Sequence, residues 1–223
     1  SNAILGMAEK MRMDVSEGQA VEWTSQFRAA RPALVQAWKN TEKAARDAMN
    51  GKEGQMYDAP GVRGLMFTTV GNDLRMVMPS GRHINYPDAK VQSKMSSVYT
   101  QRIRDIETMD METVIKHKYT DMKAMWVDST THKWQERDLY GSLFFQNYIQ
   151  GLCRDILTAA QLRLEENSFP VCINVHDELG SLVKKNDEYT YNRFHSVMTR
   201  RPQWLADDFP VLADGYIAKR YRK

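Results

Sequence analysis

The run from Tyr140 to Asn167 constrains the fold more than any other part of the chain. Its apolar residues recur at three- and four-residue steps, which is the spacing of one face of an α-helix. These residues are Phe145, Ile149, Leu152, Cys153, Ile156, Ala160 and Leu164. We therefore expect a long helix here with this face buried.

The opposite face of the same helix is predicted to carry amides and one guanidinium group. Gln146, Asn147, Gln150 and Arg154 lie there at three- and four-residue steps. Amides can donate hydrogen bonds to the acceptors that every base pair shows in the minor groove. We interpret this face as a sequence-independent contact with a nucleic-acid duplex. A face packed against another polar segment, or a neutral solvated surface, is the plainer alternative.

Two apolar, strand-like runs follow the helix, and three polar residues lie between them. The segment reads F-P-V-C-I-N-V-H-D-E-L-G-S-L-V, residues 169–183. Most hairpin turns contain Asn-Gly, Asp-Gly or Gly-Gly, because those residues tolerate positive φ. His176, Asp177 and Glu178 are not of this kind, so we expect them to serve through their side chains or their charge.

Adjacent carboxylates at a tight turn suit Mg²⁺, a hard cation that prefers oxygen ligands and keeps several waters. Two such ions can clamp the attacking and leaving oxygens in phosphoryl transfer. Zinc is disfavoured, because the five histidines show no H-E-x-x-H spacing and no Cys-x-x-Cys occurs. No G-x-S-x-G sequence indicates a serine nucleophile. A solvated turn without a chemical role is the alternative.

The remaining segments predict helices at the start of the chain and short strands after them. Residues 16–50 have a helical pattern that opens with a capping box of Ser16 and Gln19, and Pro32 is expected to divide it into two helices. Residues 63–70 and 73–78 alternate as strands, and an extended piece continues through 86.

Three further elements complete the prediction. We expect a helix near 100–115, a second one at 187–199 and a last strand from 211. Together the elements predict an α+β fold in which helices cover one face of an antiparallel sheet.

Composition adds few constraints. No apolar run approaches the ~20 residues that span a bilayer. Cys153 and Cys172 stand in apolar surroundings, so we expect reduced core thiols in a cytoplasmic protein. The net charge of +3 is too small to argue for nucleic acid by itself, and the basic tail at 219–223 is interpreted as a solvated chain end.

Several motifs together resemble the family A DNA polymerases, the bacterial polymerase I type, and especially their phage branch. V-H-D-E at 175–178 is similar to that family's motif C. Y-G-S-L-F-F-Q-N-Y-I-Q-G-L-C-R-D-I-L at 140–157 resembles the phage pattern Y-G-G-K-L-x-E-N-x-x-Q-x-x-x-R-D-L-L, and G-Y-I-A-K-R-Y-R-K at 215–223 resembles the phage terminus. M-P-S-G-R-H-I-N-Y at 78–86 and M-D-V-S-E-G-Q-A-V at 13–21 extend the resemblance over nearly the whole chain.

The resemblance implies a role for each polar residue of the turn and the helix. Asp177 would be a ligand of the catalytic Mg²⁺ ions, and Glu178 its acidic neighbour with a supporting catalytic role. The primer terminus would contact His176. The DNA-facing helix would place Gln150 in the minor groove of the primer–template, with Asn147 and Arg154 on the same face. The implied partners are primer–template DNA and deoxynucleoside triphosphates in a bacterial cytoplasm, for a phage or prophage protein.

One part of the family's machinery has no counterpart in this chain. The second metal-binding aspartate should stand in an Asp-Tyr-Ser-x-Ile-Glu setting, and the nearest imitation, D-V-S-E at 14–17, has a serine that reads as a helix N-cap. We expect 1–3 to be a tag-cleavage remnant, 4–135 a partial fingers subdomain with a phage-type β insertion, and 136–223 the C-terminal palm. The intact parent would then be a template-directed, two-metal DNA polymerase, and this fragment would be inactive alone.

Two alternatives from other classes stay open. The chain could be a non-catalytic DNA-binding module. It could also be a metal-dependent nuclease or phosphatase that uses Asp177 and Glu178, with Asp155 and Asp214 as further ligands. A homodimer of the fragment, formed through apolar surface left exposed, is a third open point.

Overall fold

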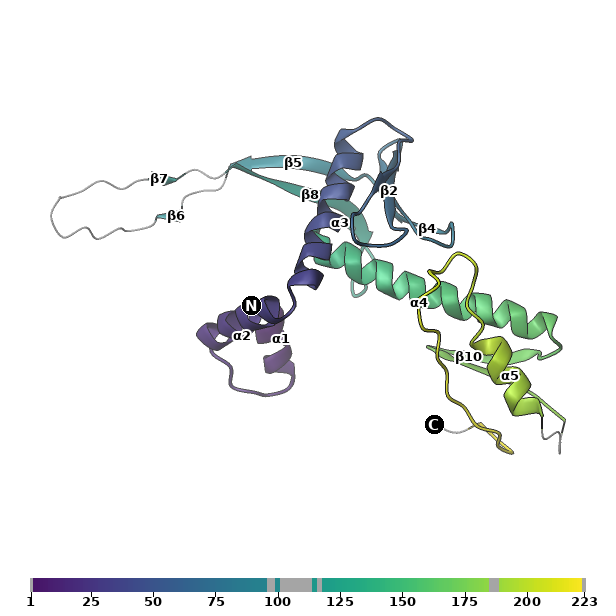
Figure 1. Cartoon of the computed structure of the whole chain (residues 1–223). Helices are drawn as coiled ribbons and strands as arrows, with labels where there is room; N and C mark the ends of the chain where they lie inside the picture. The colour runs from purple at the N-terminus through teal and green to yellow at the C-terminus, as the bar shows by residue number, and fades with distance from the viewer. Residues whose placement is uncertain (1, 96–98, 101–113, 116–117, 185–188, 222–223) are drawn as a thin grey trace.

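The computed structural model describes residues 2–95, 99–100, 114–115, 118–184 and 189–221. The structure is α+β, and every strand pair between described residues is antiparallel. Within the described residues the helices are α1 (Asn2–Lys10), α2 (Glu17–Ala30), α3 (Pro32–Asn50), α4 (Gly141–Glu166) and α5 (Thr190–Met198). Figure 1 shows α3 crossing the N-terminal end of α4, while α5 lies near the C-terminal end.

The local signals at the N-terminus are confirmed. The side chain of Ser16 accepts a hydrogen bond from the backbone N–H of Gln19, and the Gln19 side chain accepts one from the Ser16 backbone N–H, which completes the capping box. Pro32 begins α3, where its missing N–H costs nothing. Phe27 stacks on Trp38 with ring centroids 6.5 Å apart and joins α2 to α3.

A four-stranded antiparallel sheet packs against α3 in the order β1-β2-β3-β4. Its strands are β1 (Tyr57–Asp58), β2 (Met66–Val70), β3 (Asp73–Val77) and β4 (His83–Tyr86). The predicted turn between 70 and 73 is present, and Gly71 adopts a φ of 58° that a glycine reaches without steric cost. Both strands predicted before residue 80 are therefore confirmed, with the first beginning at 66.

A second sheet was not predicted. Its three strands have the order β5-β8-β9, with β5 at Lys90–Met95, β8 at Lys118–Val127 and β9 at Trp134–Leu139. The expected helix near 100–115 is wrong at both ends, because β6 (Tyr99–Thr100) pairs with β7 (Val114–Ile115). The rest of that prediction, 101–113, lies outside the described residues. Pairing between distant segments overrode the weak local pattern.

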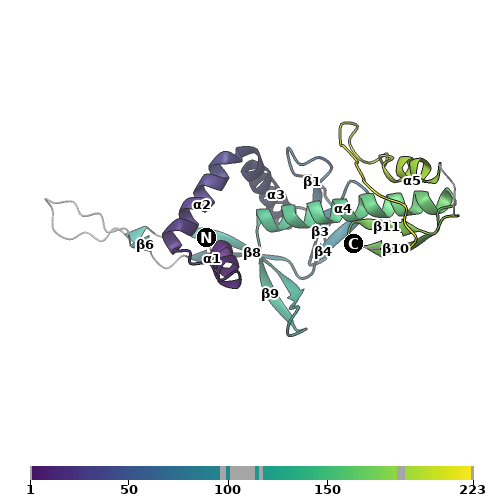
Figure 2. The same cartoon turned by 90° about the horizontal axis from the view of Figure 1, so that it is seen from below.

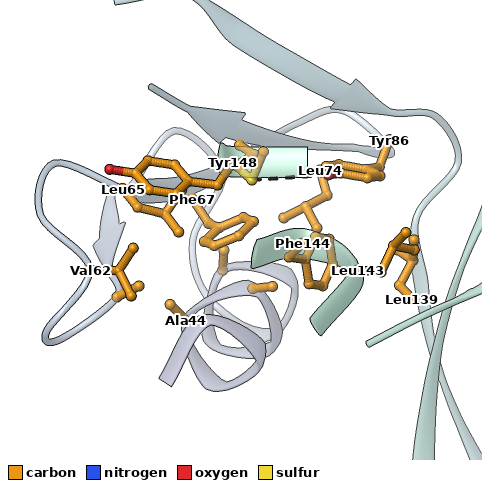
Figure 3. Packing of buried hydrophobic residues seen from close by; sticks show 14 of the residues in the cluster. Ala44, Val62, Leu65, Phe67, Leu74, Tyr86, Leu139, Leu143, Phe144 and Tyr148 are labelled. Atoms are coloured by element: carbon orange, nitrogen blue, oxygen red, sulfur yellow. Dashed lines mark hydrogen bonds between the residues drawn. The ribbon is translucent and has the colours of Figure 1, made fainter. Parts of the chain in front are cut away.

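The main core lies between α3, the four-stranded sheet and the N-terminal half of α4 (Figure 3). Phe144 has no exposed surface, and its ring meets Phe67 and Tyr86 edge-to-face at 5.2 and 5.0 Å. Residues from both sides of position 135 share this core, while the domain division at 135 stays a prediction.

The long helix is confirmed, but its buried face differs from the predicted one. Ile149 is 41% exposed and Cys153 is exposed, whereas Tyr148 and Asp155 are buried. The buried series includes Gly151 and Asp155, which no apolar pattern can detect. The expectation of core thiols is also wrong, since Cys153 and Cys172 are both exposed.

The C-terminal part is built around a small second core. A two-stranded sheet of β10 (Val171–Val175) and β11 (Glu178–Ser181) lies near α5 and the end of α4. Leu164, Phe169 and Val197 are the buried residues that these elements share. The strand expected from 211 is wrong, because the chain from 209 to 221 forms neither helix nor strand. None of the described helices is long and apolar enough to cross a membrane.

Candidate functional site

The polar residues between the predicted strands form a two-residue hairpin turn. Val175 pairs with Glu178, so His176 and Asp177 alone make the loop. His176 has a φ of 53°, in the left-handed region. Histidine is among the residues enriched there, although such conformations cost about 1–3 kcal/mol. The expectation that these residues lack a backbone role is therefore wrong for His176, whose unusual φ closes the turn.

The turn presents its groups to solvent. His176 and Asp177 are exposed, and no described residue forms a hydrogen bond or an ion pair with the Asp177 carboxylate. Glu178 is half-buried, and its Oε2 accepts a 2.5 Å hydrogen bond from the hydroxyl of Tyr221. This bond to Glu178 raises the pKa of Tyr221 above its ordinary value. The basic tail, interpreted above as a solvated end, thus makes a specific contact with the turn.

The polar face of α4 is largely as predicted. Gln146, Gln150 and Arg154 are exposed. Asn147 differs: it is half-buried, and its Nδ2 donates a 2.9 Å hydrogen bond to the Tyr86 hydroxyl. Tyr86 is buried, and this desolvation raises its pKa to about 12, although the bond from Asn147 opposes the rise. The Asn147 amide is therefore a hydrogen-bond partner of the buried Tyr86 hydroxyl.

A series of hydrogen bonds, called the relay below, connects this face to the hairpin of β10 and β11, which carries Asp177 and Glu178 and is called the acidic hairpin below. Arg154 donates from a terminal guanidinium nitrogen to Oδ1 of Asn174 on β10, at 3.3 Å. Asn174 in turn donates a 2.6 Å hydrogen bond from Nδ2 to Oε1 of Gln161, which lies about two turns after Arg154 on α4. Of the predicted residues, Arg154 is thus tied to the strand that leads into the turn.

The middle of α4 is anchored from its inner side by a turn that sequence reasoning did not connect to it. The Ser80 hydroxyl and Nε of Arg82 each bind one oxygen of the Asp155 carboxylate at 2.5 Å. A terminal nitrogen of Arg82 also donates to the Gly151 carbonyl at 3.0 Å. The turn at 79–82 thus holds the middle of α4 through Asp155 and Gly151.

The first turn of α4 is equally well held. The Glu42 carboxylate of α3 accepts a 3.0 Å hydrogen bond from the Gly141 backbone N–H, which also places negative charge at the positive end of the helix. A Cβ atom on Gly141 would lie 2.0 Å from the Trp38 carbonyl oxygen, so only glycine permits this approach. Sequence reasoning missed Glu42 and Trp38, since nothing in their local pattern marks them.

The oxygen-rich turn fits part of a magnesium site. Asp177 and the free oxygen of Glu178 are ligands of the type that Mg²⁺ prefers, and this ion commonly uses one or two carboxylates with waters and substrate phosphates. In the described part of the chain no three His, Cys, Asp or Glu residues are grouped to hold a metal ion. Asp155 is engaged by Ser80 and Arg82. The nuclease alternative, which needs Asp155 and Asp214 to converge on Asp177, lacks that geometry among these residues.

One known protein is similar to almost the whole chain. A DNA polymerase of Bacillus phage SP02 is 24% identical to it over 213 residues, which cover 96% of this chain and 29% of that polymerase. The chain therefore spans less than a third of this relative's length. No model of a known protein family matches the chain, and no solved structure does.

Proposed function

We propose that this chain is the C-terminal part of a template-directed DNA polymerase of the family A type. The observation that carries the proposal is the similarity to a phage DNA polymerase over 96% of the chain. The exposed side chains of His176 and Asp177 in the turn, and of Gln150 on α4, support it, because they are accessible to a ligand. In this proposal residues 136–223 are the palm and 4–135 the partial fingers with their β insertion.

Each group of the turn has a distinct task in the proposal. Asp177 holds a Mg²⁺ ion through a carboxylate free of other described partners, and the ion supplies charge neutralisation at the transferring phosphoryl group. Glu178 keeps a second negative charge beside it. His176 lies at the tip of the hairpin, where it can donate to the primer terminus. Because the second metal-binding aspartate is absent from this sequence, we expect no nucleotidyl transfer by the chain alone.

The exposed helix face provides the duplex contact. Gln150 donates to the acceptors common to all base pairs in the minor groove. Arg154 adds a positive charge, and its bond to Asn174 keeps the guanidinium next to the hairpin. The proposed partners are thus a primer–template duplex for this chain and deoxynucleoside triphosphates for the intact polymerase.

The proposal is tested by fluorescence anisotropy of a labelled primer–template duplex titrated with the chain across a salt series. We expect affinity that falls steeply with salt, because phosphate contacts release counterions. Gln150→Ala should weaken binding about three- to tenfold, the loss of one hydrogen bond. Gln55→Ala, which changes an exposed glutamine in the loop before β1, should leave binding unchanged. Absence of binding at low salt, or equal losses in both variants, would contradict the proposal.

The inactivity of the chain is tested separately. A primer-extension assay with Mg²⁺ and all four deoxynucleoside triphosphates should give no product. Extension that disappears in Asp177→Asn would show that the chain completes a metal site without the expected second aspartate, and would overturn this part of the proposal. A DNA-binding module without catalysis would give the binding result here and no extension even when the missing polymerase segments are supplied.

A further inference from the structure

The C-terminal segment reaches the acidic hairpin although it forms no strand of its own. Nε2 of His195 on α5 lies 3.0 Å from the Ala213 carbonyl oxygen, which ties the start of the segment to that helix. Its far end reaches Glu178, 43 residues earlier in the sequence, through the hydroxyl of Tyr221. Figure 1 shows this segment in yellow, passing α5 and β10, and Figure 2 shows it beside the same hairpin.

We propose that Tyr221 is a positioning residue for the acidic turn. Its hydroxyl holds one carboxylate oxygen of Glu178 and so fixes the orientation of the side chain that follows Asp177. The role of this orientation rests on the proposed function, in which the two carboxylates face a divalent cation. The contact itself is a property of the chain without any ligand.

The geometry explains how one hydrogen bond can fix the orientation of the Glu178 side chain. Glu178 is the first residue of β11 and pairs with Val175, so its backbone is already fixed by the hairpin. Only the side-chain torsions remain free, and a half-buried carboxylate held at Oε2 loses most of that freedom. Oε1 of Glu178 and both oxygens of Asp177 stay available to a cation.

The chemistry of the donor matters as much as its position. Tyr221 stands in a basic tail, directly after Lys219 and Arg220, yet among the described residues neither of these cations forms an ion pair with the turn. A lysine or arginine at the carboxylate would neutralise it and compete with a metal ion. A phenol donates a hydrogen bond without adding charge, so the turn keeps both negative charges.

The contact is tested by NMR of the 223-residue chain labelled with ¹³C at the tyrosine ζ carbons. The signal of Tyr221 is identified by its loss in Tyr221→Phe, and its ionisation is followed with pH. We expect Glu178→Ala to lower the titration midpoint of Tyr221 clearly. Asp177→Ala, which removes an identical charge one residue away, should lower it much less. An unchanged midpoint in Glu178→Ala, or equal shifts in both variants, would overturn the proposal.

The positioning role is tested by duplex binding in the presence of Mg²⁺. Tyr221→Phe should weaken binding about threefold in the wild-type chain. It should have no effect in a Glu178→Ala background, because the hydroxyl then has no acceptor at position 178. Equal losses in both backgrounds would overturn the route through Glu178. If the wild-type chain does not bind the duplex, the proposed function fails, and the NMR titration still decides whether Tyr221 holds Glu178.

Discussion

The two halves of α4 lie in very different surroundings. The N-terminal half packs into the larger core, which has nineteen buried residues among those described. They come from α3, the two larger sheets and their connecting loops, α4 and the segment that holds Leu205. The C-terminal half shares a core of three buried residues with the hairpin and α5. The candidate turn at 176–178 lies beside this smaller core. The polar face of α4 extends from the larger core to the smaller one.

This difference shows how the site keeps its geometry. In the larger core, apolar burial and close packing hold each side chain, as around Phe144. At the hairpin, the fixing contacts are hydrogen bonds between partly exposed groups, Arg154 with Asn174 and Tyr221 with Glu178. Such bonds are individually weak, so the site can open locally without unfolding the chain.

The largest expected effect tests the packed half. Phe144→Ala should lower the free energy of unfolding by about 3–5 kcal/mol, because loss of this fully buried ring leaves a cavity in the main core. Phe169→Ala removes a ring of the small core that is 5% exposed and meets Phe194 at 5.4 Å. It should cost about 2 kcal/mol, since a small core collapses more easily around the gap. Urea unfolding followed by circular dichroism measures both, and equal costs would remove the distinction.

The next effect appears at high pH and distinguishes two of the tyrosines whose pKa is raised, Tyr86 and Tyr221. Burial raises the pKa of Tyr86 to about 12, from 10.0. The raised folded pKa means that stability is intact below pH 10 and is lost as pH rises through 12. The loss should reach about 2–3 kcal/mol.

Tyr86→Phe should lack this alkaline loss in urea unfolding measured at stepped pH values. Tyr140→Phe, which alters an exposed tyrosine, should keep the wild-type pH dependence.

The pKa of Tyr221 is raised by its hydrogen bond to Glu178, so added salt should reduce that rise and leave the rise at Tyr86 almost unchanged. Equal salt sensitivity at both sites would contradict the contrast between burial and exposed charge.

A smaller loss is expected at the contact that joins the two halves. Asp155→Ala should lower the free energy of unfolding by about 1–2 kcal/mol, because its 8%-exposed side chain binds Ser80 and Arg82. The loss stays below that of a fully buried pair, since the Arg82 side chain is 44% exposed and regains water. Asp207→Ala, whose side chain is 97% exposed, is the matched control and should cause no measurable change. Equal losses would mean that Asp155 does not anchor α4.

Local signals in the sequence predicted the elements that depend on neighbouring residues. The capping box at Ser16, the break at Pro32 and the turn at Gly71 all act within a few residues, and all are present. The length of α4 was equally visible. Its buried face was not, because Gly151 and Asp155 are buried for contacts with the turn at 79–82 that no helical pattern encodes.

Long-range pairing accounts for what the sequence did not reveal. The β5–β8 pair joins Lys90 to Lys123, and neither strand has a strong apolar alternation. At the candidate site, the exposure of Asp177 and Gln150 agrees with the prediction, while their roles stay predictions. The contact from Tyr221 to Glu178 joins residues 43 positions apart, so local sequence patterns could not predict it.

The smallest expected effect tests whether the β10–β11 hairpin unfolds locally, independently of the rest of the chain. Asn174→Ala removes the acceptor of Arg154 and the donor to Gln161, and all of these bonds are at exposed or partly exposed positions. We expect the free energy of global unfolding to change by about 0.5 kcal/mol or less.

Local opening should respond more strongly than global unfolding. Amide hydrogen exchange at Val175 and Glu178, the pair that closes the turn, should become several-fold faster in Asn174→Ala, while exchange in β2 and β3 stays unchanged. Asn192→Ala, an exposed change on α5, should affect neither. If exchange in β2 and β3 accelerates together with the hairpin, the two halves open as one unit. The relay on α4 would then stabilise the whole chain rather than the geometry of the turn.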